Sequence, residues 1–231
     1  AFTLTDGASH SEIVVAGGME SMTNAPHLLP GARAGYRIGD GVLVDSMMYD
    51  GLYCAFDQCA MGEGTEKYAQ AHGLVREHMD AMAADSHRRA DAAQQQGLFA
   101  NEIVPVPVPQ RKGHPILVGR DEGIRETLTM DSLTGLRPAF AADGTITAGN
   151  ASQISDGAAA VIVADRAAAE LADSPILAEI LSYGQIGGSD ATLHGRPAEA
   201  IRVALKNAGL ETADLDLVEI APDAQPPVCR I

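Results

Sequence analysis

The segment from Gly144 to Val163, GTITAGNASQISDGAAAVIV, constrains the fold more than any other part of this chain. Four of its first seven residues are glycine, alanine or asparagine, Ser152 follows, and the segment closes in an apolar run that is typical of a strand. Small side chains let a backbone approach a ligand closely, and glycine tolerates positive φ angles. The pattern therefore predicts either a loop that holds a ligand at the edge of a strand or a tight structural turn.

The order of the other segments predicts an α/β fold. Short β-branched runs favour buried strands, and apolar residues at three- and four-residue spacings favour helices. On these patterns we expect strands at residues 12–16, 158–164, 177–183 and 215–220, and helices at residues 75–96, 166–171 and 197–208. Strands that alternate with helices are typical of an α/β architecture.

The clearest helix predictions are residues 75–96 and 197–208. Apolar or small residues share one face of the first: Met79, Met82, Ala83, Ser86, Ala90 and Ala93. Val75 at its start offers no side-chain oxygen as a cap. The second helix should turn Ile201, Ala204, Leu205 and Ala208 inward and end at Gly209.

Proline and glycine predict where regular structure is sparse. They recur between residues 25 and 41, and prolines punctuate EIVPVPVP at residues 102–109. Because proline donates no backbone hydrogen bond, the latter segment should be an edge strand or an arm outside any ladder.

Charge excludes some classes of partner. The 231 residues include 16 basic and 31 acidic side chains, a formal net charge of −15. Such a chain repels nucleic acid and anionic membranes at long range, so neither is an expected partner. A phosphate-rich ligand needs a local exception, and residues 111–137 provide one with five basic and four acidic residues.

Cysteine usage indicates a reducing compartment. The three cysteines are irregularly spaced without a C-x-x-C pair, which argues against a disulfide framework and against a zinc site. No metal site is expected. The sequence shows neither a membrane-length apolar run nor a leader peptide, so we expect a cytoplasmic location.

Seven sequence blocks carry a resemblance that extends over nearly the whole chain. They are VVAGGMESMTNAPH (14–27), VDSMMYDGL (44–52), AMGEGTEKYA (60–69), NEIVPVPVPQRKG (101–113), DEGIRETLTMDSLTGLRPAF (121–140), GTITAGNASQISDGAAAVIV (144–163) and DLDLVEI (214–220). In this order they resemble the thiolases, enzymes that make and break carbon–carbon bonds between acyl-CoA thioesters. The details look most like the short-chain biosynthetic branch.

The resemblance implies a five-layer αβαβα sandwich with an inserted loop domain, here incomplete. Residues 1–27 and 151–173 would form the rear part of the N-terminal domain. Residues 28–150 would form the inserted domain that covers coenzyme A, and residues 174–231 would begin the C-terminal domain. The family also implies a homo-oligomer, a dimer or a tetramer, when the protein is full length.

Thiolase chemistry needs a nucleophilic thiolate, a base for that thiol, an acid/base for the α-carbanion, and oxyanion donors. In the family these come from a C-x-S-G cysteine upstream of VVAGGMES, a histidine in G-H-P-x-G-x-S-G and a second cysteine in C-x-G-G-G. The present sequence contains none of these blocks, and it begins at Ala1 rather than at methionine. We therefore expect a fragment with no catalytic residues, inactive as given.

Four residues are candidate substitutes for the missing catalysts, and each has a simpler reading. Gly113-His114-Pro115 copies three letters of the histidine block, but Ile116 follows, which favours an exposed loop histidine. Cys54 and Cys59 have no histidine or helix N-terminus beside them in the pattern, which favours small core or wall residues. Cys229 lies in a proline-rich tail and is expected to be unreactive.

The resemblance assigns five residues to the pantetheine part of coenzyme A. The Ser152 hydroxyl would hydrogen-bond a pantetheine amide, and Ala148 and Gly149 would line the narrow tunnel. Leu136 and Met61 would wall the tunnel, although core packing is their ordinary role. Coenzyme A and acetyl-CoA would be substrates, with no tightly bound cofactor.

Two further residues would meet the nucleotide. Arg125 would lie against the adenine, with a solvated surface arginine as the alternative. Ser132 would meet the nucleotide end, with a helix N-cap as an alternative that could coexist. Ala60 departs from some biosynthetic members, which carry histidine there, so the sub-branch and the acyl-chain preference stay open.

The C-terminal edge departs most from the family. After residues 214–220 the family continues Asn-Glu-Ala-Phe into a helix, whereas this chain reads APDAQPPVCRI. Its prolines remove N–H donors and forbid a continuous helix. The tail resembles a change of reading frame or an artificial end.

Three functions remain possible on these patterns. The first is derivation from an acetyltransferase that joins two acetyl-CoA into acetoacetyl-CoA and CoA, or runs the reverse, through an acyl-cysteine. The second is a degradative 3-ketoacyl-CoA thiolase. The third is a catalytically dead polypeptide that binds CoA or serves assembly.

Overall fold

The computed structural model describes residues 12–173, 175–191 and 193–220. The strands are β1 (Ile13–Glu20), β2 (His27–Leu28), β3 (Val44–Asp45), β4 (Tyr53–Cys54), β5 (Cys59–Ala60), β6 (Val106–Val108), β7 (Ile116–Val118) and β8 (Gly157–Ala164). The α-helices are α1 (Met61–Ala71), α2 (Arg76–Gln95), α3 (Met130–Thr134), α4 (Arg166–Leu171) and α5 (Arg196–Ala208). Cys229 and the tail from Ala221 onward lie outside the described residues.

The longest strands, β1 and β8, pair antiparallel from Ile13 opposite Ala164 to Glu20 opposite Gly157. The ladder continues through Gly17, where the sequence predicted that β1 would end. A Cβ on Gly17 would lie 2.7 Å from the Ala159 carbonyl oxygen, so the close approach of the two strands requires glycine at this position.

Asp156 closes the lower end of this strand pair. Its carboxylate accepts hydrogen bonds from the Thr23 amide (2.9 Å) and the Ser21 hydroxyl (3.1 Å). These bonds, the Thr23 amide first, hold the pKa of Asp156 below its ordinary value. The hydrogen bonds of Asp156 join residues 1–27 to residues 151–173, the two segments that the resemblance assigns to the N-terminal domain. The boundaries of that domain stay predictions.

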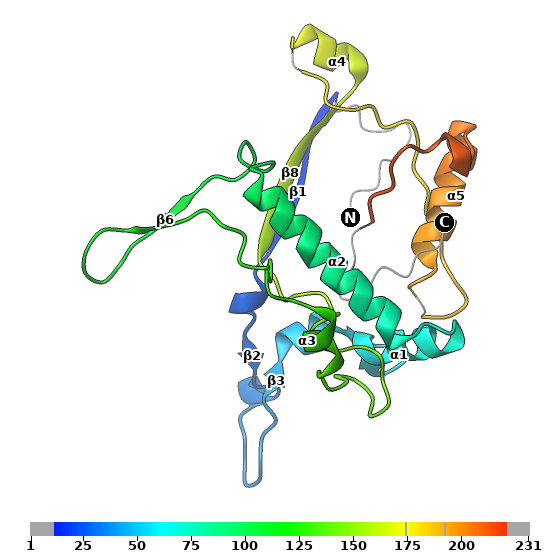
Figure 1. The fold of residues 1–231 in the computed structure, drawn as a ribbon. Coiled ribbons are helices and arrows are strands. Elements are labelled where there is room, and N and C mark those ends of the chain that lie inside the picture. Colours follow the sequence, from blue (N-terminus) through cyan, green and yellow to red (C-terminus); the bar gives the residue numbers. More distant parts are fainter. Residues whose placement is uncertain (1–11, 174, 192, 221–231) are drawn as a thin grey trace.

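The prediction that both strands are buried is wrong. Val15 is 69% exposed and Ile162 is 73% exposed. Within the described residues the sheet contains only β1 and β8, and α4 follows at one end of it (Figure 1). A strand is buried when helices or another sheet pack on its faces. A β-branched composition favours the strand but does not determine what packs on it.

The strands expected at residues 177–183 and 215–220 do not form. The first segment runs along α5 instead, where the Ser182 hydroxyl donates to the Ala204 carbonyl (2.6 Å) and Asn207 donates to the Tyr183 carbonyl (3.1 Å). A strand needs a neighbouring strand whose backbone groups complete its hydrogen bonds. This segment instead makes hydrogen bonds to a carbonyl and a side chain of α5.

The predicted helices are confirmed, with one correction to their buried faces. Val75 is the N-cap of α2 without a side-chain cap, and Gly209 ends α5 in the left-handed region at φ 70°. In α5 Leu205 is buried as expected. In α2 only Met79 of the predicted apolar face is buried, and Met82 is 45% exposed, because α3 covers only part of this helix.

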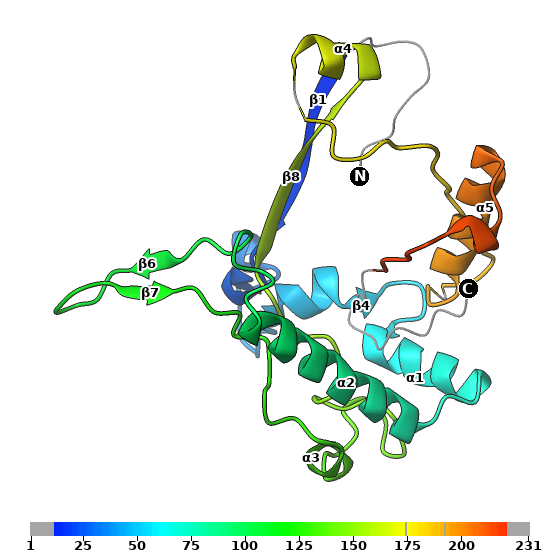
Figure 2. The ribbon, with the colours of Figure 1, turned by 45° about the horizontal axis from the view of Figure 1, so that its top comes forward.

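The proline-rich segment forms an arm. Strands β6 and β7 pair antiparallel, Val106 opposite Val118, and the hairpin projects away from the helices in both views (Figures 1 and 2). His114 lies in its exposed turn, as the sequence predicted.

The most tightly packed region lies where α1, α2, α3 and the segment after α3 meet (Figure 2). The largest fully buried side chains all belong to it: Leu133, Ile146, Thr65, Thr147 and Asp80. Three of the five are polar, so hydrogen bonding organises this region as much as apolar burial does. In the described part of the chain, no helix has both the length and the apolar character that crossing a bilayer requires.

Candidate functional site

A buried polar network holds the small-residue loop at residues 145–151. Asn150 donates to the Asp80 carboxylate (2.8 Å) and to the Thr145 carbonyl (3.0 Å), and its side-chain oxygen accepts from the Thr147 amide (2.8 Å). Asp80 also pairs with Arg76 at 2.6 Å. The loop is thereby tied to α2, with its small residues at fixed positions.

Arg76 extends the network to α3. Its guanidinium donates to the Leu133 carbonyl (2.5 Å) and to the Leu136 carbonyl (3.2 Å), at the C-terminal end of that short helix. The cation therefore meets the Asp80 carboxylate and two backbone carbonyls at the end of α3 together, which a planar guanidinium suits.

Glu66 on α1 holds the other side of the loop. Its carboxylate accepts from the Thr145 amide (2.8 Å), the Thr145 hydroxyl (3.0 Å) and the Ile146 amide (2.8 Å). Three charge-assisted bonds to consecutive residues fix the backbone where the loop begins. Sequence reasoning missed Glu66, Asp80 and Asn150; the i, i+4 spacing of Arg76 and Asp80 was the one available signal.

Two predicted coenzyme A residues meet directly. The Arg125 guanidinium donates to the Ala148 carbonyl at 3.3 Å, and the Arg125 amide donates to His87 Nδ1 at 3.1 Å. Arg125 and Ala148 are both exposed. The guanidinium therefore lies over the loop with its outer face open to solvent.

Gly149 and Leu136 are also brought together. A Cβ on Gly149 would clash with Leu133 Cδ2 and would lie 2.6 Å from Leu136 Cδ1. The Gly149 amide donates to the Thr147 hydroxyl at 3.2 Å. Gly149 is buried and Ala148 is exposed, so only Ala148 of this pair faces solvent.

Ser132 caps α3 from the third helical position. Its hydroxyl accepts from the Thr129 amide (3.0 Å) and donates to the Thr129 carbonyl (2.8 Å), and its own amide donates to the Thr129 hydroxyl (3.2 Å). The N-cap of α3 is Thr129, so the alternative prediction that Ser132 is the N-cap is wrong. Ser132 is the third helical residue and forms a capping box with Thr129.

Ser152 is exposed and anchored on both sides. The preceding Ala151 amide donates to the Thr147 carbonyl (3.0 Å), and Gln153 donates to the Gly123 carbonyl (2.7 Å). Ser152 therefore lies near Ala148, beside the segment that carries Arg125. We call the exposed residues Ala148, Ser152 and Arg125 the ledge.

Met61 lies apart from this ledge. It begins α1, it is half-buried, and its amide donates to the Leu52 carbonyl at 2.9 Å. No hydrogen bond among the described residues joins Met61 to the other six predicted residues. Its assignment to a tunnel wall stays a prediction.

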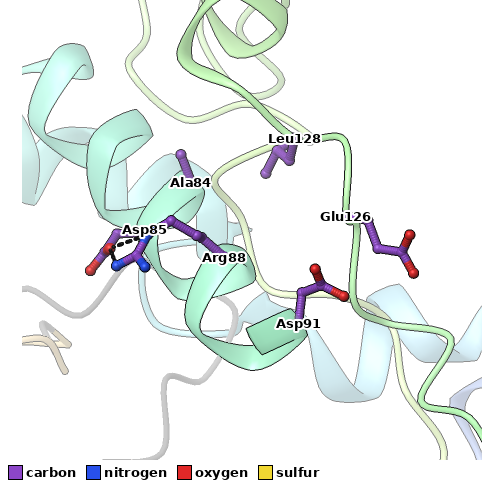
Figure 3. Close-up of a pocket in the computed structure, with 6 residues that line it drawn as sticks. All are labelled: Ala84, Asp85, Arg88, Asp91, Glu126 and Leu128. Atoms are coloured by element: carbon purple, nitrogen blue, oxygen red, sulfur yellow. Dashed lines mark hydrogen bonds and ion pairs between the residues drawn. The ribbon is translucent and has the colours of Figure 1, made fainter. Parts of the chain in front are cut away.

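A cavity of about 300 Å³ lies between α2 and the turn that follows Arg125 (Figure 3). Its lining residues are Ala84, Asp85, Arg88, Asp91, Glu126 and Leu128. Each carboxylate of the wall is ion-paired: Asp85 with Arg88 and Arg89, and Asp91 and Glu126 with Arg120. None of the seven predicted residues lines it.

His194 is a fourth residue that sequence reasoning missed. The Thr65 hydroxyl donates to the Met61 carbonyl (3.1 Å), so it accepts from His194 Nε2 at 2.7 Å. The His194 ring stacks on Tyr68, which stacks on His72. His194 thereby joins α1 to the segment that leads into α5.

Acidification should weaken this junction. Burial, and secondarily His72, hold the pKa of His194 below the ordinary 6.5. The unfolded chain then binds the proton more tightly, so the stability contributed by neutral His194 is complete above about pH 6.5 and is lost as the pH falls below it.

Urea unfolding between pH 8 and pH 5 should show this slope, and His194→Gln should reduce it. The slope that remains would report His87, whose pKa is also lowered, by burial and then by Arg125. An unchanged slope in His194→Gln would contradict the assignment.

Comparison with known proteins places these features in a family. The model of the thiolase N-terminal domain matches residues 7–167. A probable acetyl-CoA acetyltransferase of Mycolicibacterium smegmatis is 51% identical over 92% of this chain and 55% of the relative. The chain therefore spans about half the length of the curated relatives it matches.

Solved structures agree. An acetyl-CoA acetyltransferase from Syntrophomonas wolfei superposes with a TM-score of 0.82 at 37% identity, over 89% of this chain and 51% of that one. Human mitochondrial 3-ketoacyl-CoA thiolase gives 0.85 at 38% identity, over 94% and 54%. The fold is thiolase-like with α/β content, and the chain belongs to the thiolase family.

Proposed function

We propose that this chain supplies the coenzyme A binding part of an acetyl-CoA acetyltransferase. That enzyme condenses two acetyl-CoA into acetoacetyl-CoA and CoA, or runs the reverse, through an acyl-cysteine. The observation that carries the proposal is the hydrogen bond from Arg125 to the Ala148 carbonyl, on a loop fixed from both sides by Glu66 and Asp80.

The roles proposed for individual residues are supported by this geometry and by the family. Ser152 and Ala148 are exposed on the ledge and take the pantetheine, with Gly149 allowing the loop to pack closely on Leu136. Arg125 presents a cationic plane suited to the adenine, since arginine stacks on aromatic faces. Ser132 and Met61 complete the assignment as the nucleotide contact and a tunnel wall.

The architecture proposed with this function is the incomplete five-layer sandwich. Residues 28–150 are the inserted domain that carries the ledge, between segments of the two core domains. The full-length protein is proposed to be a homo-oligomer. The 231 residues as printed lack the family's catalytic cysteines and histidine, so this polypeptide is proposed to bind the substrate without turning it over.

Calorimetric titration with CoA and with pantetheine tests the proposal. Arg125→Ala should weaken CoA binding several-fold, because one stacking or hydrogen-bond contact contributes about 1 kcal/mol. It should change pantetheine binding little, since pantetheine lacks the nucleotide. Ser152→Ala should weaken both ligands by a similar factor.

Arg202→Ala is the matched control, an exposed arginine on α5 far along the chain from the ledge. It should leave both affinities unchanged. If Arg125→Ala weakens the affinity for CoA and for pantetheine equally, this arginine is structural. If Arg125→Ala and Arg202→Ala weaken CoA binding equally, Arg125 contributes only through the net charge of the protein.

The degradative reading is favoured by one observation, the superposition on the human 3-ketoacyl-CoA thiolase. The two readings differ in acyl length. Tighter binding of 3-ketooctanoyl-CoA than of acetoacetyl-CoA would favour the degradative enzyme, whereas the biosynthetic proposal expects the reverse order.

A further inference from the structure

The hairpin of β4 and β5 places two cysteines opposite each other. Cys54 and Cys59 are Cα partners in an antiparallel ladder, joined by the four residues 55–58. Directly opposed residues of such a ladder have Cα atoms about 4.5–5.5 Å apart and side chains on one face. Disulfides span about 4.4–6.8 Å between Cα atoms, so the backbone already has a bridging geometry.

Each sulfur accepts a hydrogen bond from a different donor. The Asp57 amide donates to Cys54 Sγ at 3.4 Å, and the Lys67 ammonium donates to Cys59 Sγ at 3.8 Å. The turn that makes the first contact includes Gln58 at φ 51°, a left-handed conformation that is uncommon outside glycine. The hairpin is thus a defined turn, closed just beyond the cysteines by the Met61 amide and the Leu52 carbonyl at 2.9 Å.

The two thiols differ in access. Cys54 is half-buried, whereas Cys59 is 7% exposed. A small oxidant from solvent therefore reaches Cys54 first, and Cys59 is the neighbour placed to resolve what forms there. This division between an accessible and a resolving thiol is common to redox-sensing pairs.

We propose that Cys54 and Cys59 form a redox-modification site, in which a hydroperoxide converts the cross-strand dithiol into an intramolecular disulfide. The proposal is independent of coenzyme A binding and of the catalytic residues of the family.

The chemistry balances in two steps. The Cys54 sulfur attacks the distal oxygen of the hydroperoxide, the O–O bond breaks, and the sulfenic acid forms while an alcohol, or water from hydrogen peroxide, departs. Cys59 then attacks the Cys54 sulfur, the S–O bond breaks, and water leaves with the Cys59 proton. The peroxide gains two electrons and the cysteine pair loses two.

Mass spectrometry of the 231-residue chain with Cys229→Ser tests the proposal, because only the hairpin cysteines then remain. One equivalent of hydrogen peroxide should remove two thiols and lower the mass of the tryptic peptide of residues 38–67 by two hydrogens. In the added variant Cys59→Ser, dimedone should trap a sulfenic acid at Cys54. Cys54→Ser should give far less adduct at Cys59.

Equilibration in a glutathione redox buffer shows whether the folded hairpin favours the disulfide more than the short sequence separation of the two cysteines alone does. The equilibrium constant for disulfide formation should be at least about tenfold larger in the folded chain than in about 8 M urea, where the unfolded chain can still form the disulfide across a short loop. Equal constants, intermolecular bridges, or over-oxidation of Cys54 in place of the bridge would each overturn the proposal. Dithiothreitol should restore both thiols.

Discussion

The purified 231-residue polypeptide should show no thiolysis of acetoacetyl-CoA by CoA. Thiolysis needs a cysteine that carries the acyl group, and its loss removes the covalent pathway rather than slowing one step. Neither Cys54 nor Cys59 is placed for this role, since the hydrogen-bond partners of their sulfurs are the Asp57 amide and Lys67, and no histidine of the described residues bonds to either sulfur. The loss of acetoacetyl-CoA absorbance measures the rate directly.

Contaminating thiolase from the expression host is the main confounder. The triple variant in which Cys54, Cys59 and Cys229 become serine controls for it. Activity that persists unchanged in that variant belongs to the contaminant, whereas activity that the triple variant abolishes would show that this chain has its own nucleophile and would refute the prediction. Retained CoA binding beside absent turnover would fit the proposed division of roles.

Asp80→Ala should produce the largest loss of stability of any single substitution in the described region. Asp80 is 2% exposed and compensates Arg76 while accepting from Asn150. Removing Asp80 leaves the largely buried Arg76 guanidinium without its counter-charge and the Asn150 amide with the Thr145 carbonyl as its remaining acceptor. Breaking a buried ion pair in this way costs about 3–5 kcal/mol. Urea unfolding, followed by circular dichroism, measures the change.

Asp85→Ala is the matched control on the same helix. Asp85 pairs with Arg88 and Arg89 at the surface, and the hydrogen bond from Arg88 leads the interactions that lower its pKa. Water screens an exposed pair, so the control should unfold close to the wild-type midpoint. Hydrogen exchange should locate the effect of Asp80→Ala at Thr147 and Asn150; a loss spread evenly over β1 and β8 would contradict the network.

Several features of this protein could be predicted from the sequence because they depend on neighbours along the chain. The helix at 76–95 follows from its periodicity, the end of α5 from Gly209, and the arm at 106–118 from its prolines. The family could be named from ordered blocks, and the comparisons confirm it. The small-residue loop before β8 was recognised as a candidate binding loop from composition alone.

The site shows where such reasoning stops. Ser132 was correctly placed at the start of a helix, but its role as the third residue of a capping box depends on where Thr129 sits. Arg125 was assigned to the ligand by resemblance, and its bond to Ala148 joins residues separated by 23 positions. Asp80, the residue that holds the loop, carries no local signal beyond its spacing from Arg76.

The sequence by itself determined helices α2, α4 and α5 and the family, because local propensities and ordered motifs are written in contiguous residues. Helices α1 and α3 were not predicted. Tertiary structure alone decided which segments gain partners. Residues 177–183 have strand composition yet run along α5, and β8 is apolar yet exposed, because strand pairing and burial depend on what lies alongside. Asp80 and Asn150 are 70 residues apart, and only folding makes their hydrogen bond possible.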